Sequence, residues 1–166
     1  MIDLGSLLNG IKPYVLGWID GHEAAGCRVM SGATQSINSG SLTPLTFDTE
    51  LNDPASCWAV DDPGKLYAPV DGYYLAGGMW TMTAAQNTAA SRILVEVRLN
   101  GTTSLATNEL HSIAGKAAQV NVTAGMFWMA AGEYIEILAF HDEGSAKNTS
   151  GGSSTNQWVN GWLAKM

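Results

Sequence analysis

The 166-residue chain has few charged residues, and basic residues are the scarcest of them. Charged side chains make up 14% of the sequence, and 8 Lys and Arg stand against 15 Asp and Glu, for a formal net charge of −7. A protein that neutralises phosphate groups would work against its own electrostatic field at this charge. The composition therefore argues against nucleic acid and anionic membrane surfaces as partners.

Cysteine is also scarce, and the common catalytic motifs are missing. Cys27 and Cys57 are the only two cysteines, too few for a disulfide framework. We expect two free, buried thiols, with a Cys27–Cys57 disulfide as the alternative. The sequence contains no Gly-x-Ser-x-Gly, His-Glu-x-x-His, phosphate-loop or Cys-x-x-Cys motif. We therefore expect neither enzyme activity nor a cofactor.

Two groups of polar residues are the remaining candidates for a metal site. His141, Asp142 and Glu143 are consecutive, so on a strand they cannot all point at one ion, and we interpret them as a solvated turn. A second, acidic group surrounds the segment 50–65. Its members are Asp48, Glu50, Asp53, Asp61 and Asp62. Carboxylate oxygens suit calcium, but the group lacks the ordered spacing of an EF-hand loop, so calcium is only an alternative to no metal.

Residues 1–25 differ from the rest of the chain because their apolar residues follow a helical period. The apolar stripe consists of Leu4, Leu7, Leu8, Ile11, Val15 and Trp18. Asp3 lies where a secretory signal would carry positive charge, and the stretch is shorter than the ~20 apolar residues of a membrane span. Pro13 predicts a break in the helix. We predict an anchor or assembly segment that docks on other subunits or another protein, with packing on its own domain as the alternative.

From residue 26 onward the apolar residues alternate with polar ones, and the 19 glycines of the chain fall mainly among turn residues. Eight segments have strand character: 26–31, 42–49, 66–83, 91–99, 102–108, 117–129, 132–141 and 157–165. Eight short strands in about 140 residues are typical of an all-β, antiparallel two-sheet sandwich or jelly roll. We therefore predict one such domain over residues 26–166.

Three of these segments are apolar on both faces. In 91–99, apolar Ile93, Val95 and Val97 alternate with mainly charged residues, as expected for one buried and one wet face. Segments 72–82, 124–129 and 157–165 instead carry large apolar side chains at both parities. We expect their sheet to pack on its partner sheet with one face and on neighbouring subunits with the other. The predicted interface consists of Tyr73, Leu75, Met79, Phe127, Met129, Trp158 and Trp162.

Five stretches, in their order and spacing, give the domain a family resemblance. They are "LTFDTE" (45–50), "GYYLAGGMW" (72–80), "RILVEVRLNG" (92–101), "MAAGEYIEI" (129–137) and "VNGWLAKM" (159–166). Over residues 27–164 the chain resembles the C1q and tumour-necrosis-factor-like (TNF-like) jelly-roll family, especially small structural proteins of tailed bacteriophages and prophages. The resemblance implies a homotrimer in which the sheet with the third, sixth and eighth strands lines the threefold axis.

The function expected from this resemblance is structural. The chain has no Gly-X-Y repeat, so the roles of collagen-stalked extracellular ligands are not carried over. A short apolar segment joined to one jelly roll is similar to a virion protein, assembled in the bacterial cytoplasm, that binds a capsid or tail protein through residues 1–25. We predict a capsid decoration or fibre-like protein. A dimer would also suit a sheet that is apolar on both faces.

The loops opposite the termini carry the alternative function. In a jelly roll of alternating strands, loops 84–91, 111–115 and 142–157 lie at one end, and all are small and polar. A host-surface receptor or carbohydrate site there would use Gln86, Asn87, His111, Lys147 and Asn148. Aromatic residues, which carbohydrate sites use as stacking platforms, are scarce in these loops. This scarcity favours the structural role over the binding module.

Overall fold

The structure is a computed structural model that describes residues 26–88, 90–152 and 158–166. The predicted anchor segment 1–25, with Leu4, Leu7, Leu8, Ile11, Val15 and Trp18, lies outside these residues. Within the described part every regular element is a strand, and no helix there is long and apolar enough to cross a membrane. The predicted all-β antiparallel sandwich is confirmed.

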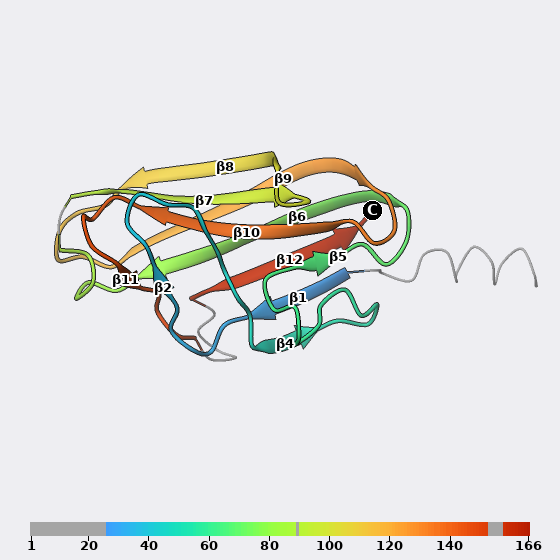
Figure 1. Ribbon diagram of the computed structural model, residues 1–166, viewed down its shortest axis with the longest axis horizontal. Helices are drawn as coiled ribbons and strands as arrows, with labels where there is room; N and C mark the ends of the chain where they lie inside the picture. The colour runs from blue at the N-terminus through green and yellow to red at the C-terminus, as the bar shows by residue number, and fades with distance from the viewer. Residues whose placement is uncertain (1–25, 89, 153–157) are drawn as a thin grey trace, which may run out of the picture.

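Twelve strands occur in the described residues (Figure 1). They are β1 (Gly26–Met30), β2 (Ser36–Ile37), β3 (Thr43–Pro44), β4 (Thr49–Asn52), β5 (Leu66–Tyr67), β6 (Gly72–Met82), β7 (Arg92–Leu99), β8 (Thr103–His111), β9 (Ala118–Met129), β10 (Tyr134–His141), β11 (Lys147–Asn148) and β12 (Asn160–Lys165). One sheet has the order β4-β1-β12-β6-β9; the other has the order β3-β10-β7-β8, with β5 paired to β10. A small third sheet pairs β11 with β2.

All eight predicted strand segments contain strands, but the structure divides two of them. Segment 42–49 becomes β3 and β4, which join different sheets, and segment 66–83 becomes β5 and β6, separated by the turn at Asp71. The strands β2 and β11 were not predicted. Each has two residues, too short to give a period in the sequence.

The core lies between the two sheets and follows the expected alternation. Ile93, Val95 and Val97 of β7 are fully buried. Trp80 of β6 is also fully buried, and its indole Nε1 donates a 2.9 Å hydrogen bond to the carbonyl of Leu94 in the opposite sheet. This bond satisfies the polar atom of the largest core side chain and ties the sheets together.

The two ends of the sandwich differ in what they display. The C-terminus lies at one end, and the loops that follow β6, β8 and β10 gather at the other (Figure 1). This arrangement agrees with the strand alternation used to predict the distal loops. The described chain therefore begins and ends at one end of the long axis, and these loops form the opposite end.

Candidate functional site: the outer sheet face and the distal loops

The sheet that contains β6 has an apolar outer face. On β6, Tyr74, Ala76 and Trp80 point into the core and are fully buried, whereas the residues between them point outward. With their neighbours on β9 and β12 they form what we call the outer face. Its large apolar side chains are Tyr73, Leu75, Met79, Met126, Trp128 and Trp162, and the exposed polar residues Gln119, Asn121 and Thr123 of β9 lie on the same side. A surface with this many aromatic and methionine side chains is unusual for a monomer in water.

Trp162 lies across the middle of the outer face because its neighbour is a glycine. Trp162 pairs with Gly77 in the β12–β6 register. A Cβ atom on Gly77 would lie 2.7 Å from Cζ2 of Trp162 and 2.5 Å from the carbonyl oxygen of Val122. Glycine at this position therefore lets the indole ring lie against the strand.

Tyr73 and Trp128 form an aromatic pair near the end of the outer face. Their ring centroids are 5.2 Å apart and their planes meet at 78°, an edge-to-face arrangement. Tyr73 is 50% exposed, Trp128 53% and the neighbouring Met126 65%. The chain thus orders large apolar side chains and leaves about half of each in solvent.

Two residues predicted for the subunit interface, Phe127 and Met129, lie in the core instead. The β6–β9 register pairs Ala76 with Ala124 but Tyr74 with Phe127, so β9 carries one extra residue at a bulge. The bulge reverses which parity of β9 faces outward. Met129 is consequently fully buried and Phe127 packs against the core.

The same bulge moves Met126 and Trp128 to the outer face, where the sequence prediction had not put them. Gly125 lies within the bulge, and an isolated glycine inside a strand is the signal that would have suggested it. Tyr73, Leu75, Met79 and Trp162 lie on the outer face as the parity predicted. Trp158 precedes β12 and is 39% exposed.

The other large sheet carries charge on its outer surface. Arg98 Nε donates to Glu96 Oε1 at 2.8 Å, and Arg92 Nε lies 3.1 Å from Glu109 Oε2. The Arg98–Glu96 pair is mostly buried, with 23% and 9% of the two side chains exposed. The Arg92–Glu109 pair is about half exposed, and an exposed pair of this kind contributes little to stability but keeps a surface solvated. The two outer surfaces of the sandwich are therefore chemically distinct, and the apolar one is the candidate interface.

The three distal loops are joined by a hydrogen-bond network rather than being separate. Asn87 is fully buried, and its Nδ2 donates to the carbonyls of Ile113 at 2.9 Å and Lys116 at 2.7 Å. Ser91 Oγ donates to Glu143 Oε1 at 2.8 Å. Asn87, predicted as a ligand contact, is therefore occupied in holding two loops together, because its amide satisfies buried backbone carbonyls.

The other predicted contact residues lie closer to solvent. His111 and Asn148 are exposed, and Gln86 accepts a 3.2 Å hydrogen bond at Oε1 from the backbone N–H of Asn148. Lys147 Nζ donates to Thr88 Oγ1 at 3.0 Å. Gln86, Lys147 and Asn148 are thus brought together on loops far apart in sequence, whereas His111 lies at the end of β8.

The segment 141–143 is not the solvated turn that its sequence suggested. His141 is fully buried, and its Nε2 lies 2.9 Å from the carbonyl oxygen of Ile37 while its Nδ1 accepts the N–H of Glu143 at 3.2 Å. This pattern assigns the proton to Nε2 of a neutral imidazole. The Glu143 side chain is buried too, because it accepts hydrogen bonds from the Ser91 and Thr88 hydroxyls after β10 has ended at His141. Only Asp142 is exposed.

Two of the acidic residues around segment 50–65, Asp48 and Asp62, have separate hydrogen-bond partners. Burial alone would raise the pKa of Asp48, but hydrogen bonds from the Gly32 N–H at 2.8 Å, the Thr49 hydroxyl at 2.8 Å and the Ala33 N–H at 2.9 Å hold that pKa below its ordinary value. The pKa of Asp62 is lowered too, mainly by the hydrogen bond from the Tyr67 hydroxyl and to a smaller extent by Lys65. Each of these carboxylates has its own partners instead of converging with the rest.

A cavity of about 380 Å³ lies at the distal end of the outer face, beside Trp158. Thr81, Thr83, Ser150 and Gly151 help to line it. Thr81 is 5% exposed, and its Oγ1 has no hydrogen-bond partner among the described residues. A half-exposed indole beside an unsatisfied hydroxyl is a combination that a polar ligand with an apolar face would fit.

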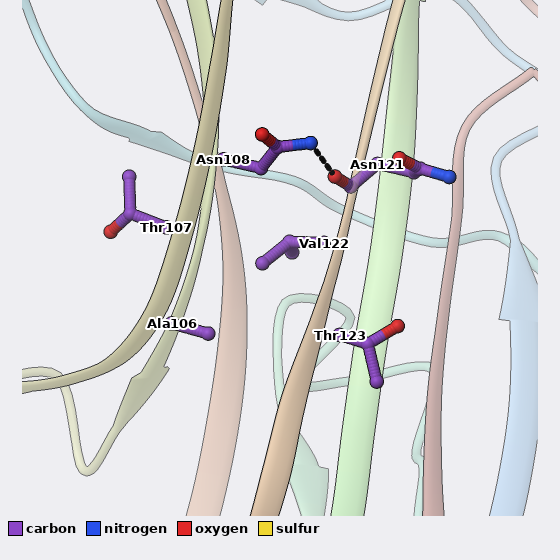
Figure 2. A pocket seen from close by; sticks show the side chains of 6 residues that line it. All are labelled: Ala106, Thr107, Asn108, Asn121, Val122 and Thr123. Atoms are coloured by element: carbon purple, nitrogen blue, oxygen red, sulfur yellow. Dashed lines mark hydrogen bonds between the residues drawn. The ribbon is translucent and has the colours of Figure 1, made fainter.

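A second cavity, of about 300 Å³, lies between β8 and β9, where the edges of the two sheets meet (Figure 2). Asn108 reaches across it and donates from Nδ2 to the carbonyl of Asn121 at 2.7 Å, as Figure 2 shows. Val122 points into the gap while Thr107 points away from it. This polar groove has no aromatic lining residue and no titratable one, so it is a weak candidate for a binding site.

The comparisons with known proteins identify the fold. No family model and no curated protein sequence matches the chain. Among solved structures, Eiger TNF from S. frugiperda is 9% identical with a TM-score of 0.63, covering 86% of this chain and 92% of its own. The globular domain of zebrafish complement 1qA is 13% identical with a TM-score of 0.56, covering 86% and 96%. Murine APRIL is 12% identical with a TM-score of 0.62, covering 87% and 100%. At these identities the likeness extends to the fold, and the chain has the jelly-roll fold of TNF-like and C1q-like proteins.

Proposed function

We propose that this chain is a non-enzymatic, homotrimeric structural protein of a tailed-bacteriophage virion, a capsid decoration or fibre-like protein whose jelly-roll head is displayed outward. The observation that carries the self-association is the outer face. Tyr73, Met126 and Trp128 leave half or more of their surface in solvent, and Leu75, Met79 and Trp162 lie partly exposed on the same side of the sandwich. Burying such a surface against copies of itself is the simplest way to remove it from water.

A threefold arrangement suits the position of the outer face. The face lies on β6, β9 and β12, the strands that correspond to the third, sixth and eighth predicted segments, and the family resemblance assigns these to the threefold axis. The opposite sheet, with its ion pairs, then faces solvent. The resemblance of the sequence motifs to small phage proteins and the apolar stripe in residues 1–25 support attachment to a capsid or tail protein.

Two experiments separate the oligomer from its location. Light scattering coupled to gel filtration should give three times the mass of one chain, and a monomer at micromolar concentration contradicts the self-association. Peptide mass spectrometry of purified phage particles from the encoding strain should find the chain in stoichiometric amounts. Its absence from particles that contain their other structural proteins contradicts the virion role.

A second candidate function is recognition of a host-surface carbohydrate at the distal end. The cavity beside Trp158 favours it, because an indole platform and an unpartnered buried hydroxyl on Thr81 suit a sugar ring. Calorimetry against host-wall glycans should show binding that Trp158→Ala abolishes and that the exposed-loop control Ile113→Ser retains. Binding that survives Trp158→Ala, or no binding at all, argues against this function.

A further inference from the structure

The two cysteines of the chain meet beside a carboxylate, although they are far apart in sequence. Cys27 lies on β1, Asp53 follows β4, and Cys57 lies in the segment that leads to β5. Their two Sγ atoms and a carboxylate oxygen all lie within 4.8 Å of one another. Among the described residues this is the one group of three or more such side chains within ligating range.

Both thiols are free and buried, as the sequence predicted. Cys57 is fully buried and Cys27 is 5% exposed. The neighbouring Cys57 thiol, together with burial and the charge of Asp53, raises the pKa of Cys27 far above its ordinary value. Without a cation the Cys27 thiol therefore holds its proton, because a thiolate there would lie beside a second sulfur and a carboxylate in a buried site.

The backbone fixes the three side chains in place. Asp53 Oδ1 accepts the N–H of Cys57 at 2.8 Å, and Oδ2 accepts the N–H of Trp58 at 2.9 Å. The carbonyl of Cys57 in turn accepts the N–H of Tyr67 at 2.7 Å. Cys27 is held from the other side by its pairing with Leu163 on β12. The carboxylate still has unused lone pairs for a further partner, since an ionised carboxylate accepts about four hydrogen bonds.

We propose that Cys27, Asp53 and Cys57 form a binding site for a thiophilic divalent cation of the zinc class, which ties the 53–58 segment to β1. Two sulfurs and one oxygen are a donor set that suits Zn²⁺ and disfavours Ca²⁺. Tetrahedral Zn²⁺, with sulfur at about 2.3 Å and oxygen at about 2.1 Å, separates its ligand atoms by roughly 3.3–3.8 Å. The three ligand atoms lie within 4.8 Å of one another, so small side-chain movements would bring them to this spacing.

Charge balance explains why the ion is needed for the thiols to ionise. Binding converts two thiols and one M²⁺ into a neutral M(S)₂ unit and releases two protons, while Asp53 supplies a third ligand and remains an anion. A neutral unit is far easier to bury than two bare thiolates. The site does not depend on the proposed function, and it strengthens the strand next to β12 in either case.

Cadmium titration of the reduced full-length chain tests the site directly. Cd²⁺ is the probe, because its bonds to thiolates give an ultraviolet charge-transfer absorption that bonds to carboxylate or imidazole do not. The expected result is saturation at one Cd²⁺ per chain with release of two protons, and displacement of Cd²⁺ by Zn²⁺. Added Zn²⁺ should also raise the melting temperature, since the ion binds the folded state.

Matched variants distinguish a site from adventitious binding. Cys27→Ser and Cys57→Ser should each lose the absorption and the Zn²⁺-dependent rise in melting temperature, and Asp53→Asn should weaken binding while keeping the absorption. His111→Ala, at an exposed imidazole, should behave as the parent does. Metal-free melting of every variant shows that each one folds.

Two results overturn the proposal. One is the absence of the Cd²⁺–thiolate absorption in protein whose two cysteines are both reduced, as shown by their reaction with a thiol reagent after unfolding. The other is a Cys27–Cys57 disulfide, found by mass spectrometry in protein purified without reductant, which makes the pair a redox couple instead of a metal site.

Discussion

Replacing Trp128 by serine tests whether the outer face holds copies of the chain together. A tryptophan buries up to about 250 Å², and Trp128 leaves 53% of its surface exposed in one chain. Allowing for the area that serine retains, the variant loses about 100 Å² of apolar contact per copy, or about 2.5 kcal/mol at ~25 cal/mol per Å². Each chain should still fold, because the removed ring contributes little to the core.

The effect is multiplied in the assembly because every copy carries the change. Three copies lose about 7 kcal/mol, which is about 10⁵-fold in the trimer dissociation constant. The concentration at which half of the chains dissociate varies as the square root of that constant, so it should rise several-hundred-fold.

Sedimentation equilibrium over a concentration series measures that midpoint for the parent and the variant. The matched control is Ile113→Ser, which removes an apolar side chain that is 69% exposed, more than Trp128, from a distal loop. Circular dichroism should show that both variants fold. If Trp128→Ser and Ile113→Ser have the same midpoint, or if the parent is a monomer throughout, the outer face is not an interface.

Three further predictions follow from individual contacts. Met129→Ala should cost about 2–5 kcal/mol in urea unfolding, because it leaves a cavity in the core; a cost below about 1 kcal/mol contradicts the bulge register. Gly77→Ala should displace Trp162 and change its fluorescence emission, since the added Cβ meets the ring at 2.7 Å; an unchanged spectrum contradicts this packing. Asp48 has a lowered pKa, so its stabilising effect should be complete above its ordinary pKa and be lost as the pH falls through the lower pKa of the folded state, where the carboxylate takes up a proton. Asp48→Asn should therefore lower the urea midpoint at neutral pH and flatten its acid dependence, and equal midpoints at every pH contradict the assignment.

The fold class and most strand positions follow from the amino-acid pattern alone. Alternation in segments such as 91–99 is a local property, since successive side chains on a strand point to opposite faces wherever the strand pairs. The surplus of apolar residues at both parities of 72–82 likewise showed that a face would stay exposed. The alternation of apolar and polar residues predicts these features because it depends only on residues one and two positions apart in the sequence.

Which side chains occupy that face and which are buried beneath it depends on how the strands pair in three dimensions. The single extra residue at the β9 bulge exchanged Phe127 and Met129 for Met126 and Trp128, and pairing across the sheet, not composition, determines where a bulge sits. Chain folding also buried Asn87 and His141 in hydrogen bonds to distant backbone. It placed Cys27 beside Cys57 as well. Contacts between residues far apart in sequence depend on the register of paired strands, and a local sequence pattern does not specify that register.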